Sequence, residues 1–412
     1  MKVLLVVGAR PNFMKVAPII AAIHEHNDRV NRGLIDRSET LDYVLVHTGQ
    51  HYDRKMSDSF FEDLKMPQPD VNLGVGSGSH AVQTGEIMKR FEPVLLEEAP
   101  DMVLVAGDVN STIACSLVAA KLECGPNGKR PLIGHVESGL RSFDRAMPEE
   151  CNRVMTDHLA DMLFVTEGSG VVNLRREGID PEKVFFVGNT MIDSLLASKD
   201  KAAAESTILS RLGLKNGKPG QYGLLTLHRP SNVDQREGFL SILEGISELA
   251  QQFPVVFPSH PRTLERIRKF GLQQFFVESG SVGIQNRPGI HVIEPLGYLD
   301  FLCLMMHAKI VVTDSGGIQE ETTGLGVPCV TVRENTERPV TIEQGTNVLA
   351  GVEPEGIRAA VEKQLKATRK TELPEHWDGR SATRIVEAIV TKLSSGADCA
   401  AELVFEQSSA TA

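Results

Sequence analysis

Short apolar runs recur along the whole chain, and most of them end in glycine, histidine, aspartate or serine. Their length and their β-branched residues predict buried strands. Amphipathic stretches such as MKVAPIIAAIHEH lie between many of them and predict helices. Strands that alternate with helices are typical of doubly wound parallel sheets. The predicted strands lie in VLLVVGAR, YVLVHTGQH, MVLVAGDVN, LIGHVESG, MLFVTEGS and VFFVGNT, then in YGLLTLHRP, VVFPSH, GIHVIEP, IVVTDSGG and VPCVTV.

A polar connector, KDKAAAESTILSRLGLKNGKPGQ, divides this pattern into two halves of similar size. We therefore predict an α/β fold of two Rossmann-like doubly wound domains that face a cleft, because open α/β sheets bind ligands at the carboxyl ends of their strands. The predicted parts are an N-terminal domain over 1–195, a C-terminal domain over 196–375, a final helix over 376–395 that returns to the first domain, and a loosely ordered tail over 396–412.

Composition narrows the class of protein. With 412 residues, 41% hydrophobic and 24% charged, the chain is typical of a soluble globular protein. Its net charge of -11 argues against non-specific binding to nucleic acid or membrane surfaces. The six cysteines are scattered without a C-x-x-C pair, which indicates reduced thiols and no metal site. The first apolar run is too short for a signal peptide, so we expect a cytoplasmic protein.

A glycine corner follows the apolar run at residues 310–312. Ser315, Gly316 and Gly317 stand where a helix is expected to begin. A helix N-terminus attracts anions, so a phosphate could bind there, although such a corner is also often only a tight turn. The chain has neither a Walker A motif nor a G-x-G-x-x-G after its first strand, which removes most support for an ATP- or NAD-dependent mechanism.

Cations also follow predicted strands. Arg10 and Lys15 come after the first strand, and His228 and Arg229 come after the first strand of the second half. Together with the glycine corner they could neutralise a diphosphate, whereas each taken alone is best explained as a solvated side chain.

Acids follow strands of the first half. Asp108 and Glu137 end apolar runs, where a carboxylate is costly unless it has a partner or a task. Glu149 and Glu150 come directly after Pro148, at a predicted helix start. For Glu150 we favour a capping role, while the spacing of Glu149 and Arg153 fits either a helix ion pair or a functional acid.

The motifs of the sequence, taken in order, resemble those of a known family. GARPNFMKVAP, TGQH, GDVNST, GHVESGLRS, MPEECNRVMTDHLAD, VGNTMID, TLHRPSNVD, EPLGYLDFLCLM, TDSGGIQEE and ENTERPVT occur in the order found in the non-hydrolysing UDP-N-acetylglucosamine 2-epimerases. The resemblance spans roughly residues 2–390, and several of these motifs are long.

The resemblance implies a glycosyltransferase-B-like fold, a homodimer, and interconversion of UDP-N-acetylglucosamine and UDP-N-acetylmannosamine without a cofactor or metal, to supply polysaccharide precursors. UDP would leave with the C2 proton to give a 2-acetamidoglucal, and would then re-add with inversion at C2. The implied catalytic residues are Asp108, Glu137, Glu149 and His228, and the implied substrate-binding residues are Arg10, Lys15, Arg153, Phe301, Ser315, Gly316, Gly317 and Glu321.

Some positions differ from the commoner family pattern. RPNFMK replaces RPEAIK, and PSHPRT stands where many bacterial members have a motif beside a regulatory substrate site. Gln50, His51 and His260 remain as possible regulatory residues. The alternatives are a 2-epimerase of a UDP-diacetamido sugar, a hydrolysing 2-epimerase, a glycosyltransferase of the same fold, and a non-catalytic nucleotide-sugar sensor.

Overall fold

The computed structural model describes residues 1–35, 39–50, 63–64, 66–214, 222–277, 284, 287–368 and 372–394, apart from the side chains of Arg10 and Asn127. The chain forms two compact units: unit 1 is Met1–Ser194 with Glu375–Ala412, and unit 2 is Leu195–Pro374. The chain first passes from unit 1 to unit 2 between Ser194 and Leu195, within α7 (Thr190–Glu205). The tail predicted over 396–412 lies outside the described residues.

Unit 1 is built on a parallel sheet of seven strands in the order β3-β2-β1-β4-β5-β6-β7. The order reverses between β1 and β4, which is where doubly wound sheets bind their ligands. The strands are β1 (Lys2–Val7), β2 (Asp42–His47), β3 (Val71–Asn72), β4 (Met102–Ala106), β5 (Leu132–Ser138), β6 (Met162–Val165) and β7 (Val184–Phe186).

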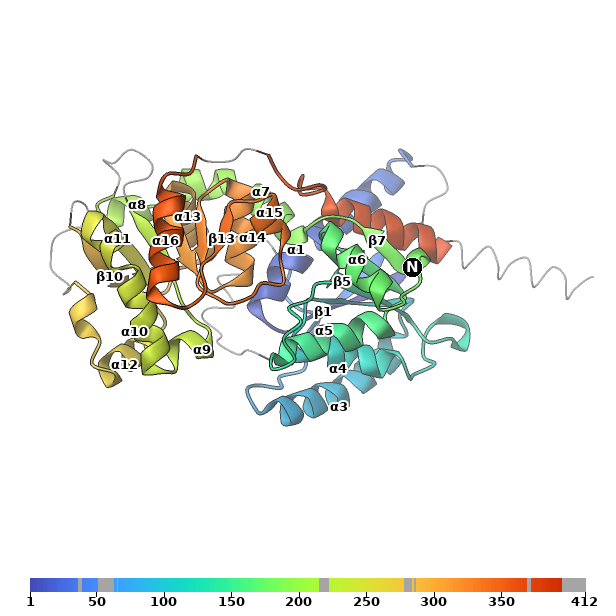
Figure 1. Ribbon diagram of the computed structural model, residues 1–412. Coiled ribbons are helices and arrows are strands. Elements are labelled where there is room, and N and C mark those ends of the chain that lie inside the picture. Colours follow the sequence, from blue (N-terminus) through green and yellow to red (C-terminus); the bar gives the residue numbers. More distant parts are fainter. Residues whose placement is uncertain are drawn as a thin grey trace, which may run out of the picture. The chain divides into compact units, whose positions relative to one another are not determined.

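Helices cover both faces of this sheet. Successive residues of β1 alternate between two apolar clusters, as the twofold periodicity of a strand requires. Val3, Leu5 and Val7 pack toward α1 and the helix over residues 381–394, whereas Leu4 and Val6 pack toward α3 and α4. Figure 1 shows α3 lying beside α4. The helices are α1 (Arg10–Asn31), α3 (His80–Glu98), α4 (Asn110–Ala119), α5 (Pro148–Leu159) and α6 (Gly168–Arg176), with 3₁₀ turns at Pro126–Gly128 and Pro181–Lys183.

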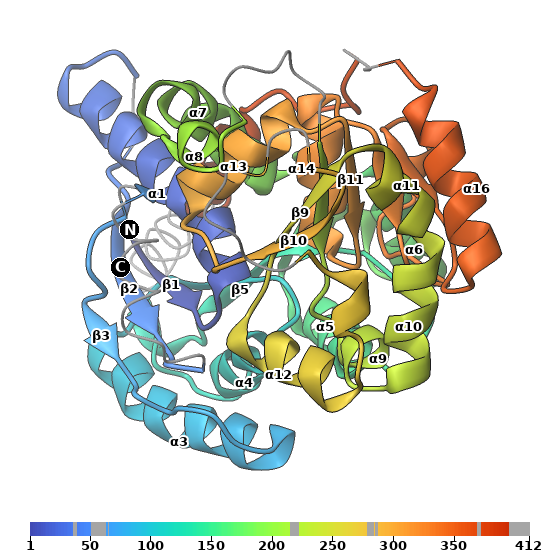
Figure 2. The ribbon, with the colours of Figure 1, turned by 90° about the vertical axis from the view of Figure 1, so that its left-hand side faces the viewer.

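Unit 2 repeats this design with six parallel strands in the order β10-β9-β8-β11-β12-β13. Here the reversal lies between β8 and β11. Figure 2 shows α10 and α16 side by side over the sheet. The strands are β8 (Gly223–Thr226), β9 (Pro254–Pro258), β10 (Gly289–Ile293), β11 (Ile310–Thr313), β12 (Cys329–Thr331) and β13 (Asn347–Leu349). The helices are α8 (Ile208–Arg211), α9 (Pro230–Val233), α10 (Arg236–Gly245), α11 (Ser247–Gln252), α12 (Pro261–Lys269), α13 (Tyr298–His307), α14 (Gly316–Leu325), α15 (Val340–Glu343) and α16 (Pro354–Leu365), with a 3₁₀ turn at Gln273–Phe275.

The predicted α/β class with two doubly wound sheets is confirmed. The sequence pattern missed β3 and β13, because strands of two or three residues at a sheet edge have too few positions to show periodicity. Among the described residues, no helix has the length and the apolar character needed to cross a membrane.

Candidate active site

The turn after β1 is held against β4 by one asparagine. The Oδ1 atom of Asn12 accepts from the backbone N–H groups of Gly8 (3.0 Å) and Ala9 (2.9 Å), and its Nδ2 donates to the carbonyl of Ala106 (2.7 Å). Gly8 leaves no space for a side chain, since an added Cβ would lie 2.1 Å from Ser111 Oγ. The start of α1, which carries Lys15, is therefore fixed over the sheet.

Lys15 and Glu137 form a buried ion pair in unit 1. Glu137 has φ +70°, a left-handed conformation that is uncommon without glycine, and it lies where the register between β5 and β6 shifts. Such a conformation costs on the order of 1–3 kcal/mol and is concentrated at functional sites. The cation that the sequence assigned to phosphate binding thus contacts one of the predicted catalytic acids.

Asp108 follows β4 and is paired with α5. Arg153 donates from Nη2 to Asp108 Oδ2 (2.5 Å) and from Nη1 to Glu150 Oε2 (2.9 Å). Glu150 also accepts from the backbone N–H groups of Ser142 and Phe143, so it is structural as expected, but it holds the loop before α5 and does not cap the helix. Arg153 therefore links α5 to the end of β4 through Asp108, and within α5 it pairs with Glu150 in place of Glu149.

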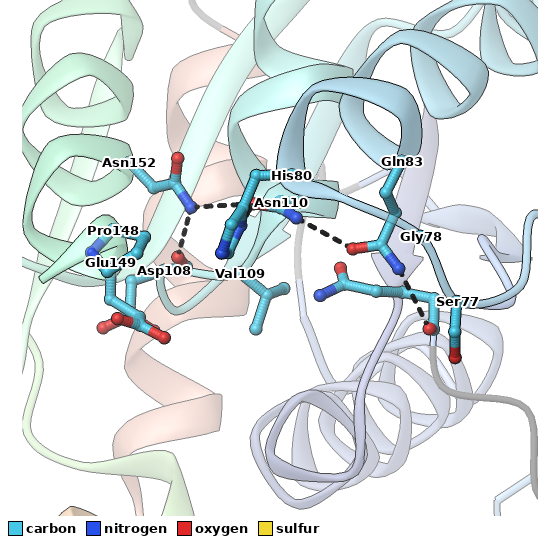
Figure 3. A pocket seen from close by; sticks show the side chains of 11 residues that line it. Ser77, Gly78, His80, Gln83, Asp108, Val109, Asn110, Pro148, Glu149 and Asn152 are labelled. Carbon is cyan, nitrogen blue, oxygen red and sulfur yellow. Dashed lines mark hydrogen bonds between the residues drawn. The ribbon is translucent and has the colours of Figure 1, made fainter. Parts of the chain in front are cut away.

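Glu149 and Asp108 line a pocket of about 310 Å³. Figure 3 shows their side chains close together at one end of it, with Ser77 and Gly78 at the other. The segment 74–80 follows β3 and contributes Ser77, Gly78 and His80 to the wall of this pocket.

Amide side chains form the inner wall of the pocket. Asn152 Nδ2 donates to the backbone carbonyl of Asp108 (2.9 Å), Asn110 Nδ2 donates to Gln83 Oε1 (2.8 Å), and His80 Nδ1 contacts Asn110 Oδ1 (3.2 Å) (Figure 3). Gln50, a predicted regulatory residue, also lines the pocket and accepts from the Ser111 hydroxyl (2.7 Å).

In unit 2, Asp314 organises the loop after β8. This fully buried carboxylate contacts His228 Nδ1 (2.8 Å) and accepts from the backbone N–H of Arg229 (2.9 Å) and from Asn232 Nδ2 (3.2 Å). Burial alone would raise the pKa of Asp314, but the hydrogen bond and the charge of His228 lower it below its ordinary value. The His228 side chain is 65% exposed, so a buried carboxylate orients an accessible imidazole.

The predicted glycine corner is the start of α14. Ser315 is its N-cap and Gly316 its first residue, and an added Cβ on Gly316 would lie 2.6 Å from Arg338 Nη1. Arg338 is held by Glu320 (2.9 Å) and Glu337 (3.4 Å). A guanidinium thus lies against a helix N-terminus, which is the combination that binds phosphate groups.

A buried carboxyl group lies further along α14. Glu321 accepts a hydrogen bond from Tyr298 Oη (3.2 Å) of α13, the helix that also carries Phe301. Burial raises the pKa of Glu321 to about 8, although the hydrogen bond from Tyr298 lowers it. In the ligand-free protein, Glu321 is therefore largely protonated at neutral pH.

We expect Glu321→Gln to change how stability depends on pH. The folded chain holds the Glu321 proton more tightly than the unfolded chain, whose pKa is 4.5, so the contribution of Glu321 to stability is fully present below pH 4.5 and is lost as pH rises to about 8. Across this window the free energy of unfolding of the variant should gain ~1.4 kcal/mol per pH unit on that of the wild type. Chemical denaturation at several pH values measures this gain. Glu355→Gln, at an exposed position of α16, is the control, and a difference that does not vary with pH contradicts the prediction.

Two predicted residues cannot be placed: His51 and the side chain of Arg10 lie outside the described part of the chain. His260 is the N-cap of α12, where its Nδ1 accepts from the Arg262 N–H (3.3 Å). Sequence reasoning missed Asn12, Asp314 and Arg338 as parts of the two sites. Arg338 lies in the quoted motif ENTERPVT, but nothing in its spacing pointed to α14.

Comparison with known proteins identifies the family. A profile described as UDP-N-acetylglucosamine 2-epimerase matches residues 34–390. The UDP-N-acetylglucosamine 2-epimerase of Methanococcus maripaludis is 41% identical over 395 residues, which cover 94% of this chain and 98% of that protein. The UDP-2,3-diacetamido-2,3-dideoxy-D-glucuronate 2-epimerase of Pseudomonas aeruginosa is 37% identical over 390 residues, covering 94% and 99%.

A solved structure agrees with these sequence matches. The crystal structure of Methanocaldococcus jannaschii UDP-GlcNAc 2-epimerase in complex with UDP-GlcNAc and UDP has a TM-score of 0.81 and 41% identity, covering 95% of this chain and 100% of that one. The chain is an isomerase with a two-domain α/β fold. It belongs to the UDP-N-acetylglucosamine 2-epimerase family, and the resemblance found in the sequence is confirmed.

Proposed function

We propose that the chain interconverts UDP-N-acetylglucosamine and UDP-N-acetylmannosamine. The observation that carries this proposal is that acidic side chains gather in unit 1, whereas a phosphate-binding arrangement lies in unit 2. Unit 1 holds carboxylates at the ends of β4 and β5 and at the start of α5, and unit 2 holds an arginine at the N-terminus of α14. The first set suits proton transfer and the second suits a departing diphosphate.

The proposed reaction balances without a redox partner. A carboxylate of unit 1 takes the C2 proton while the C1–O bond breaks, so that a C1=C2 double bond forms and UDP leaves. UDP then attacks C1 again as a proton is delivered to the opposite face of C2. We assign proton transfer to Asp108, Glu137 and Glu149, and sugar or leaving-group contacts to Arg153 and His228.

The remaining residues bind the nucleotide in this proposal. Ser315, Gly316, Gly317 and Arg338 contact the diphosphate, Glu321 accepts from ribose hydroxyls, and Phe301 lies by the uracil. Arg10 and Lys15 keep the phosphate role that the resemblance gave them, with Lys15 also neutralising Glu137. The homodimer, the cytoplasmic location and regulation through Gln50, His51 and His260 stay predictions.

A second substrate is supported by one comparison. The Pseudomonas aeruginosa relative named for a UDP-diacetamido-glucuronate is 37% identical, close to the 41% of the relatives named for UDP-N-acetylglucosamine. Its named substrate differs by a second acetamido group and a carboxylate on the sugar ring. Parallel assays with both nucleotide sugars would separate the two substrates by kcat/KM.

We expect incubation with UDP-N-acetylglucosamine alone in D2O to give the C2 epimer with deuterium at C2, as read by NMR. Deuterium enters because the C2 proton exchanges with solvent before UDP re-adds. A hydrolysing 2-epimerase would instead release N-acetylmannosamine and UDP. A glycosyltransferase, which lacks its acceptor here, would leave C2 unlabelled. Substrate recovered with its C2 proton intact and no epimer would refute the proposed function.

A further inference from the structure

His135 contacts the backbone next to the predicted acids of unit 1, but it is not one of the proposed site residues. It is in the middle of β5, and its side chain is fully buried. Nδ1 contacts Asp157 Oδ1 (2.7 Å), and Nε2 contacts the backbone carbonyl of Gly107 (2.8 Å). Gly107 directly precedes Asp108, so one ring connects α5 to the backbone at the end of β4.

Both partners of the ring are hydrogen-bond acceptors. A peptide carbonyl has no proton to give, and neither does an ionised carboxylate. Burial would raise the pKa of Asp157, but the charges and hydrogen bonds of His135 and Arg141 lower it, so Asp157 is ionised. The carbonyl of Gly107 can only accept, so Nε2 of His135 carries a proton and donates to it.

Arg141 also holds Asp157 in place. Arg141 Nη2 contacts Asp157 Oδ2 (2.7 Å) and Glu177 Oε2 (2.7 Å), and both side chains of the Arg141–Asp157 pair are buried. Arg141 thus pairs with two carboxylates, Asp157 and Glu177. A buried charge is tolerated when it is paired and hydrogen-bonded in this way.

Asp157 extends the connection to the second strand end. Its Oδ2 accepts from the backbone N–H of Gly139 (3.1 Å), two residues after Glu137. Both glycines have left-handed backbones, with φ +68° at Gly107 and φ +79° at Gly139. The His135–Asp157 pair therefore holds the two turns that carry Asp108 and Glu137.

We propose that His135 is a positioning residue that fixes the Gly107–Asp108 peptide and thereby aligns Asp108 with Glu137. The proposal rests on the proposed function, since it needs these acids to act together. It assigns His135 no contact with substrate. Its effect on turnover passes through the carbonyl of Gly107.

Two substitutions separate the two bonds of the ring. The amide nitrogen of glutamine reaches about as far as Nε2, and that of asparagine about as far as Nδ1. His135→Gln therefore keeps a donor for Gly107, whereas His135→Asn keeps one only for Asp157 and leaves the Gly107 carbonyl without its bond. Misplacement of a catalytic group by about 1 Å can cost about 100-fold in rate, so we expect kcat of the Asn variant to fall by about that factor with KM little changed.

The Gln variant should retain most of kcat, and this difference distinguishes positioning from a general loss of stability. His291→Asn is the matched control, because it removes the contact of a buried ring Nε2 with the carbonyl of Arg287 (2.7 Å) in unit 2. Thermal unfolding of all three variants checks that each is folded. Equal kcat in the Asn and Gln variants would overturn the proposal.

A measurement on the wild-type protein keeps the proposal testable if the variants do not fold. Long-range 1H–15N spectra should show a proton on Nε2 of His135, the nitrogen that contacts the Gly107 carbonyl. Selective loss of this signal in His135→Gln, or stepwise assignment if that variant is unstable, identifies it. An Nε2 atom without a proton would overturn the proposal, whereas a failed D2O exchange experiment with a protonated Nε2 would refute only the proposed function.

Discussion

We expect the single substitutions Asp108→Asn, Glu137→Gln and Glu149→Gln to lower turnover by about 100-fold or more, the usual scale of general acid–base catalysis. Each amide keeps the shape of its acid but can neither take nor give the proton. UDP affinity should largely survive, because none of the three acids is a proposed nucleotide-binding residue and most of those residues lie in unit 2. Steady-state kinetics with the epimerisation assay and calorimetry with UDP measure the two effects.

Stability must be measured beside turnover. Glu137→Gln breaks the ion pair with buried Lys15, and loss of one partner of a buried pair costs about 3–5 kcal/mol. Glu98→Gln is the control, since it removes only a part-exposed ion pair with Lys2 (3.1 Å) in the same unit. Wild-type turnover in all three folded amide variants would place the catalytic residues elsewhere.

Gly316→Val should lower UDP affinity by about 100-fold, the loss expected when a charge-assisted bond and a helix N-terminus are both displaced. The added side chain would meet Arg338, whose Nη1 lies 2.6 Å from the position of a Cβ on Gly316. It would also cover the N–H groups at the start of α14. Calorimetric titration with UDP measures the affinity.

Gly168→Val is the matched control for this substitution. Gly168 is also the first residue of a helix, α6, but a Cβ there would meet no atom within 4 Å. Its variant should bind UDP as the wild type does. If Gly316→Val retains wild-type UDP affinity while folded, the diphosphate does not bind at this end of α14.

The acids after strands were the part of the candidate site that the sequence located best. Asp108 and Glu137 end apolar runs, and the cost of burying a carboxylate marks such positions without knowledge of the fold. For Glu149 the helix spacing left two interpretations open. In the fold, Arg153 pairs with Asp108, 45 residues away in the sequence, and with Glu150, 3 residues away. Helix spacing cannot predict the contact with Asp108.

Contacts between segments far apart in the chain explain what the sequence did not show. Lys15 meets Glu137 across 122 residues, and Asn12 holds Ala106 across 94 residues. Arg338 reaches the start of α14 from a loop that has no periodicity of its own. A motif can mark such residues as notable, but it does not say which other residues they contact.

The sequence by itself determined the alternation of strands and helices, the division into two α/β halves and the family, because hydrophobic periodicity and motif order are local properties of the chain. The tertiary structure alone decided the order of the strands, the left-handed backbone of Glu137 and the buried links from His135 and Asp157 to Gly107 and Gly139. All of these features depend on which strand ends become neighbours in the sheet. Parallel strands are joined by long crossover connections, and a short stretch of sequence does not show on which side of the sheet the next strand is added.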